Sequence, residues 1–149
     1  MIQRIQSIFL FLIITLSIVA FFVSFGEKLS NEGMNQLVLL ANGGSPAEII
    51  HFQSIELTFL NSALLMLSFS TILLFKNRIL QMRLCMIGSL LTLIMLVLVF
   101  YIADSMPGSG LVHYQLGTYI LVLQLVLFFM ARKFIRKDEI MVRAADRIR

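Results

Sequence analysis

Residues 84–103 read LCMIGSLLTLIMLVLVFYIA, and this stretch decides the fold class. It has no charged side chain, and its length matches the roughly 20 residues that an α-helix needs to cross about 30 Å of hydrocarbon. Three further runs have a similar length and character, at residues 7–25, 55–75 and 111–131. A membrane-spanning strand would need only about 9–11 residues of alternating polarity. The sequence therefore predicts four transmembrane helices.

The composition of the whole chain supports this prediction. Of the 149 residues, 59% are hydrophobic and 13% are charged, whereas a soluble domain has about 45–50% apolar and about 25% charged residues. The surplus apolar surface requires lipid as its solvent. The run 7–25 is longer than the apolar core of a signal peptide, about 7–15 residues, so we expect a retained helix. The single cysteine, Cys85, excludes a disulfide within the chain.

Basic residues set the expected orientation of the four helices. They precede the first run, fill the link between the second and third, and follow the fourth; an even number of spans brings these three segments to one side. The basic residues of this side are Arg4, Lys76, Arg78, Arg83, Arg132, Lys133, Arg136, Lys137, Arg143, Arg147 and Arg149, and only Lys28 falls on the other side. Because basic residues in short loops stay in the cytoplasm, both termini are predicted to be cytoplasmic.

The segment 26–54 is long for a link between two helices, where about 2–8 residues are usual. Residues 34–40 are apolar enough to pack on another element, and residues 42–44 predict a turn. Ser45, Pro46 and Glu48 have the spacing of a capping box with proline at the first helical position, so the second helix is predicted to begin near Pro46. The segment is interpreted either as a lid over the helix ends or as a surface for a ligand or partner.

Polar side chains within the apolar runs give two interpretations. Thr58, Asn61 and Ser62 share one helical face in the second run, and Gln115, Thr118 and Tyr119 share one in the fourth. Either these faces pack the second and fourth spans together through hydrogen bonds, or they line a small polar cavity that opens outward. The cavity residues would be Glu56, Asn61 and Gln115.

Catalytic and cofactor chemistry is not predicted. No lysine, arginine or acidic residue lies near the middle of a run, where a proton-coupled transporter needs a titratable group. The two histidines, His51 and His113, lie near the outer surface without the spacing of a haem or zinc site. No serine, threonine or cysteine has a visible base partner. We therefore expect a protein that is not an enzyme and has no cofactor.

The tail, residues 132–149, has no glycine or proline, so the fourth helix is expected to continue beyond the membrane. It has an apolar face and a set of charged residues that could contact a partner or lipid headgroups. Together with Arg4, this set is Arg132, Lys133, Arg136, Lys137, Asp138, Glu139, Arg143, Asp146 and Arg147. Anchoring on headgroups and docking of a protein partner both fit. The mixing of acids with bases beyond Lys137 favours docking, and the lack of interleaved aromatics argues against nucleic acid.

Both ends of the chain carry recognisable motifs, MIQRIQ at residues 1–6, IRKDE at 135–139 and ADRIR at 145–149. With these motifs the chain resembles the uncharacterised bacterial four-span proteins catalogued as a domain of unknown function. The resemblance implies an inner-membrane protein with four helices and implies no reaction. We also hypothesise that the two ends meet, with Gln3, Arg4 and Gln6 near Arg136, Asp138 and Glu139.

The sequence thus predicts an all-α fold: an integral membrane, antiparallel four-helix bundle that forms one domain over residues 1–149, with a cytoplasmic helical extension at 132–149. The expected function is a non-enzymatic accessory or scaffold protein of the bacterial inner membrane that docks a partner through its tail. The alternative is a small permease or lipid-binding protein with a polar cavity between the second and fourth spans. Membrane lipids and a protein partner, or further copies of the chain, are the expected partners.

Overall fold

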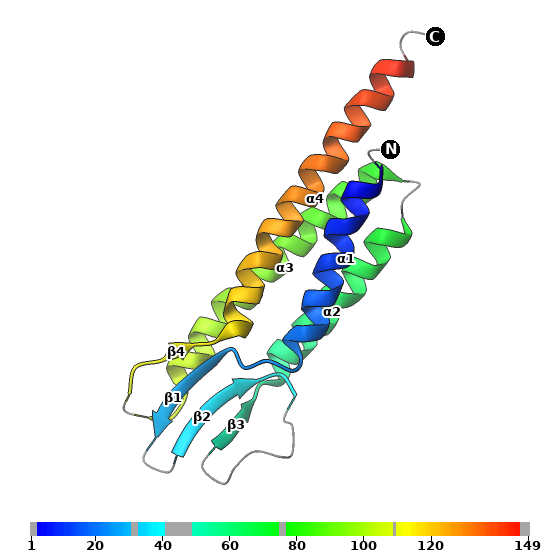
Figure 1. Cartoon of the computed structure of the whole chain (residues 1–149). Helices are drawn as coiled ribbons and strands as arrows, with labels where there is room; N and C mark the ends of the chain where they lie inside the picture. Colours follow the sequence, from blue (N-terminus) through cyan, green and yellow to red (C-terminus); the bar gives the residue numbers. More distant parts are fainter. Residues whose placement is uncertain (1–2, 31–32, 41–48, 75–76, 109, 147–149) are drawn as a thin grey trace.

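The computed structural model describes residues 3–30, 33–40, 49–74, 77–108 and 110–146. Its main elements are four helices, α1 (Gln3–Ala20), α2 (Ile55–Leu73), α3 (Arg78–Ser105) and α4 (Leu116–Asp146). They pack side by side in a ring, because α1 contacts α2 and α4, and α3 contacts α2 and α4 (Figure 1). The fold class is all-α, as expected. Within the described residues, α2, α3 and α4 are long and apolar enough to cross a membrane, and α1 has a shorter apolar stretch at Ser7–Ala20.

The two ends of the bundle differ. The beginning of α1, the link between α2 and α3 and the end of α4 lie together at one end, called here the basic end (Figure 1). The opposite end, called the sheet end, carries a four-stranded sheet with the order β3-β2-β1-β4. Its strands are β1 (Gly26–Ser30), β2 (Gly33–Val38), β3 (Ile49–Gln53) and β4 (His113–Tyr114). β1 runs antiparallel to β2 and β4, and β2 runs parallel to β3.

The sheet corrects the prediction for the start of the second helix. Residues 49–53 form strand β3 rather than helix, and Pro46 itself lies outside the described residues. Pairing with β2 uses the backbone hydrogen bonds of this segment, and Ser54 then caps α2 by accepting a bond from the Leu57 N–H at 3.3 Å. The expected packing of residues 34–40 is confirmed in part, because Leu37, Val38 and Leu39 are buried.

The sheet also changes the bounds of the first and fourth helices. The predicted run 7–25 is helical only to Ala20, since the Phe25 N–H donates to the carbonyl of Leu37 and so joins the sheet at 2.8 Å. The predicted run 111–131 becomes helical at Leu116, after β4. Thr118 Oγ1 donates to the carbonyl of Phe25 at 2.6 Å and ties the first turn of α4 to the chain that enters β1.

Lys28 attaches the sheet to α3. Its Nζ donates to the main-chain oxygens of Asp104 at 2.9 Å and Met106 at 2.8 Å, at the end of that helix. The last carbonyls of a helix lack partners within the helix and carry a partial negative charge, so an ammonium there is stabilising. Lys28, the basic residue of the sheet end, therefore stabilises the contact between the sheet and α3.

Candidate functional site

The end of α4 holds most of the tail residues that the sequence singled out. α4 runs unbroken through Asp146, in keeping with the lack of glycine and proline in the tail. Four basic side chains, Arg132, Lys133, Arg136 and Lys137, are exposed along it. Arg147 lies outside the described residues, as do the side chains of Arg4, Arg143 and Asp146.

Asp138 differs from the other charged tail residues because it is buried. Its carboxylate Oδ2 lies 3.3 Å from Nη1 of Arg78, at the first residue of α3, and the same nitrogen lies 3.4 Å from the main-chain oxygen of Asp138. The two side chains are only 9% and 18% exposed, so little water screens their interaction. Asp138 is therefore a structural residue that fixes α4 against α3, rather than part of an exposed charged surface.

The structure supports only part of the hypothesis that the two chain ends meet. The beginning of α1 does lie beside α4, where Phe9 stacks on Phe134 with ring centroids 5.3 Å apart. Asp138 forms an ion pair with Arg78 of α3, while the side chains of Gln3, Arg4 and Gln6 lie outside the described residues. The sequence alone predicts only a role in orientation for Arg78, because Asp138 lies 60 residues further along the chain.

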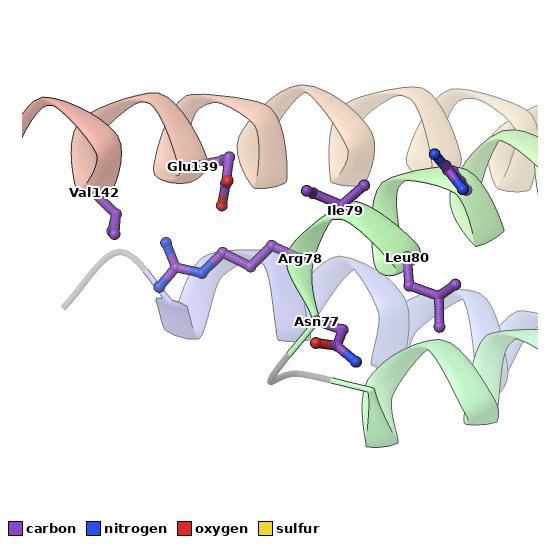
Figure 2. Close-up of a pocket in the computed structure, with 7 residues that line it drawn as sticks. Asn77, Arg78, Ile79, Leu80, Glu139 and Val142 are labelled. Carbon is purple, nitrogen blue, oxygen red and sulfur yellow. The ribbon is translucent and has the colours of Figure 1, made fainter. Parts of the chain in front are cut away.

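A hollow of about 520 Å³ opens where α3 begins against α4. Its lining combines two arginines and an acid with apolar side chains, namely Asn77, Arg78, Ile79, Leu80, Arg83, Glu139 and Val142. Figure 2 shows Glu139 and Val142 pointing from α4 toward the side of the hollow into which Arg78 extends. The hollow was not predicted, because its walls come from segments that are far apart in the sequence.

The buried stripe of α4 continues past the bundle. The positions that face the other helices follow steps of three and four residues, which is the spacing of a helix that packs along its length on neighbours. They are Gln124, Leu127, Ala131, Phe134 and Asp138. The next position of this series is Met141, which is 38% exposed, and the neighbouring Ile140 and Val142 are 59% and 40% exposed. We call residues 139–146 the projecting end of α4.

The three residues expected to bound a polar cavity lie in separate surroundings. Asn61 is fully buried, and its Nδ2 donates to the carbonyl of Ser17 on α1 at 2.9 Å. Glu56 is exposed in a second hollow, of about 550 Å³, between the start of α2 and the end of α3. Gln115 precedes α4, where its backbone N–H donates to the carbonyl of Phe25 at 3.0 Å. The structure therefore does not assemble these residues around one cavity.

The polar faces of the second and fourth spans do not pack on each other as expected, since α2 and α4 occupy opposite corners of the ring. Asn61 and Gln124 instead converge on Ser17 of α1, because Nε2 of Gln124 donates to Oγ of Ser17 at 2.9 Å. The remaining oxygens, Oδ1 of Asn61 and Oε1 of Gln124, are buried and have no hydrogen-bond partner among the described residues. This polar contact fixes three helices relative to one another.

No group of three or more His, Cys, Asp or Glu side chains able to hold a metal occurs in the part of the chain that the structure describes. In the comparison with protein families, the model described as a domain of unknown function (DUF4293) matches residues 2–148. Neither the curated proteins nor the solved structures contain a match to the chain.

Proposed function

The chain belongs to the family described as a domain of unknown function (DUF4293), and we propose that it is a non-enzymatic accessory or scaffold protein of the bacterial inner membrane. In this proposal it docks a protein partner through the projecting end of α4. The observation that carries the proposal is the buried stripe of α4, which extends beyond the helices that cover it and presents Ile140, Met141 and Val142 to the surroundings.

The length and direction of α4 support docking rather than anchoring alone. At 1.5 Å per residue its 31 residues measure about 46 Å, against about 30 Å of hydrocarbon. An amphipathic anchor lies in the plane of the headgroups, which would require α4 to bend after its basic residues. α4 instead continues along the long axis of the bundle (Figure 1), so its projecting end is directed away from a membrane that surrounds the bundle.

Burial of the exposed apolar side chains would supply the affinity. Complete burial of a Val, Ile or Met side chain contributes about 1.5–3 kcal/mol, and these three residues are already partly covered. A partner helix that packs along the same stripe would extend the spacing already used inside the bundle. Glu139 next to this surface would then contribute more to the choice of partner than to affinity.

We further propose that all four helices span the membrane in antiparallel order, with both termini in the cytoplasm. Six basic residues whose side chains the structure describes lie at the basic end, namely Arg78, Arg83, Arg132, Lys133, Arg136 and Lys137. Lys28, at the sheet end, is engaged by the carbonyls of α3. Such an asymmetry favours a cytoplasmic basic end. A reporter fused after residue 149 should act in the cytoplasm, and one inserted at residue 42 outside it; the reverse result would contradict the topology.

Site-specific photo-crosslinking in membranes tests the docking proposal. A photoreactive residue in place of Met141 should give one discrete protein adduct, because this side chain would lie within the interface. The matched control replaces Lys133, which is exposed two turns earlier on the face of α4 away from the bundle. The substitution Met141→Glu, tested with a photoreactive residue at position 140, should abolish the adduct. Absence of a protein adduct at positions 140, 141 and 142 would refute docking by this surface.

Truncation needs a cut that leaves the bundle complete. Removal of the chain after Lys133 would also remove Ile135, which is fully buried, and Asp138 with its ion pair. A stop codon after Glu139 keeps both residues and removes the exposed apolar surface. We expect this shortened chain to retain its thermal stability and lose the partner, whereas a shortened chain that keeps the partner would contradict the proposal.

A further inference from the structure

We propose that the hollow between α3 and α4 at the basic end binds the headgroup of an anionic phospholipid, with its phosphate held between Arg83 and Arg132. The hollow borders the docking surface, because Glu139 and Val142 of the projecting end are among its lining residues, whereas Arg83 and Arg132 lie outside that surface. Arg83 lines the hollow, and Arg132, which is not one of its lining residues, is placed next to Arg83 by the register of α3 against α4.

Two contacts fix how α3 lies against α4. Arg78 pairs with Asp138, and Gly88 packs against the ring of Phe128. The two contacts are ten residues apart on each helix, which sets the register of α3 against α4. Arg83 lies halfway along this interval on α3 and is therefore level with position 133 of α4. Arg132 follows Phe128 by four residues, which puts it on the side of α4 that faces α3.

The depth of the two arginines is that of lipid phosphates. Arg83 immediately precedes the apolar run 84–103, and Arg132 immediately follows the run 111–131. Both guanidinium groups therefore lie at the edge of the hydrocarbon, where phosphate oxygens are available. Arginine binds phosphate through two parallel N–H···O bonds, and basic pockets between transmembrane helices are known binding places for anionic headgroups.

The charge around the hollow favours an anion. The charged residues that line the hollow are Arg78, Arg83 and Glu139, and the register of the helices adds Arg132 next to Arg83. A volume of about 520 Å³ is within the usual range for a small-molecule site. The outward face of α3 below Arg83 exposes Met86, Ile87 and Leu90, which would contact the acyl chains of the same lipid. This apolar face favours a lipid over a free phosphate or an acidic protein segment.

Binding of short-chain phosphatidylglycerol to the full chain in a neutral detergent tests the proposal, with short-chain phosphatidylcholine and inorganic phosphate as comparison ligands. The unmodified chain should bind phosphatidylglycerol most tightly. Each arginine contributes about fivefold in affinity, so Arg83→Gln/Arg132→Gln should bind about 25-fold more weakly. The control Lys133→Gln/Lys137→Gln removes the same charge from other sides of α4 and should bind as the unmodified chain does.

Three results would overturn the proposal. Equal loss of binding in the two double variants would mean that the net charge attracts the lipid without a site. Inorganic phosphate that binds as tightly as phosphatidylglycerol would exclude a lipid-specific site, and phosphatidylcholine that binds as tightly would exclude recognition of the anion. Thermal melts show whether the arginine pair variant is folded; if it is not, the single variants Arg83→Gln and Arg132→Gln, each expected to weaken binding about fivefold, decide the question.

Discussion

Close packing of α3 on α4 depends on Gly88, and its replacement by alanine gives the sharpest test of the bundle. A Cβ atom built on Gly88 would lie 2.5 Å from Cε1 and 2.7 Å from Cζ of Phe128. The ring of Phe128 is 1% exposed, so it is enclosed and cannot move freely out of the way. Small residues commonly permit such close approach of helices in membranes.

Two opposing effects set the size of the change. Alanine is favoured over glycine inside a helix by about 1 kcal/mol, while overpacking of a well-filled core costs about 1–3 kcal/mol. The sum predicts that Gly88→Ala lowers the free energy of unfolding by about 0–2 kcal/mol. In a Phe128→Leu background the clash is removed and only the helix preference remains, so the same substitution should stabilise the protein by about 1 kcal/mol.

Equilibrium unfolding of the purified chain in mixed micelles, with increasing denaturing detergent, measures both values. The four proteins of the double-mutant cycle should give a coupling free energy of about 1–3 kcal/mol between positions 88 and 128. Phe128→Leu alone is the control for the loss of ring contacts. If Gly88→Ala stabilises the protein equally with and without the Phe128 ring, the helices do not approach as described and the reasoning fails.

Three further substitutions test other contacts by the same unfolding assay. Asp138→Asn should lower the free energy of unfolding by about 1.5–3 kcal/mol because it leaves Arg78 without its carboxylate, and this cost should largely disappear in an Arg78→Gln background. Gln124→Leu should change the free energy of unfolding by less than about 1 kcal/mol. It removes the hydrogen bond to Ser17, but it also removes a buried oxygen that has no described partner. A larger loss would mean that this oxygen has a strong partner. Ser54→Ala should cost about 0.5–2 kcal/mol through the lost cap of α2, with faster hydrogen exchange in the first turn as a local check.

The helices were predictable because each one is a long apolar run, a property of local sequence. α2 begins at residue 55, where its run begins, and α3 contains the whole of the run 84–103. The sheet was not predictable for the opposite reason. β2 pairs in parallel with β3, which is separated from it by residues 39–48, and the short β4 pairs with β1 from far along the chain. Strands such as GEKLS show no alternation that would identify them alone.

A local signal for a helix start can also be overruled by such pairing. Ser45, Pro46 and Glu48 have the spacing of a capping box, yet the serine that caps α2 is Ser54. The five residues of β3 lie between the two serines, and their backbone groups bond to β2. Capping residues indicate where a helix can begin, and pairing with a partner strand determines where it does begin.

The same distinction decides which part of α4 belongs to the bundle and which part is available for docking. Steps of three and four residues along α4 continue through Met141 to the end of the tail, so the sequence of this helix alone gives no boundary. The boundary comes from α3, whose first residue, Arg78, pairs with Asp138. Beyond that ion pair the apolar residues of α4 continue the spacing of the buried stripe, but their side chains are exposed. An apolar stripe that a protein leaves uncovered at such a place is typical of an interaction site, and the start of α3 therefore sets the limit of the proposed docking surface on α4.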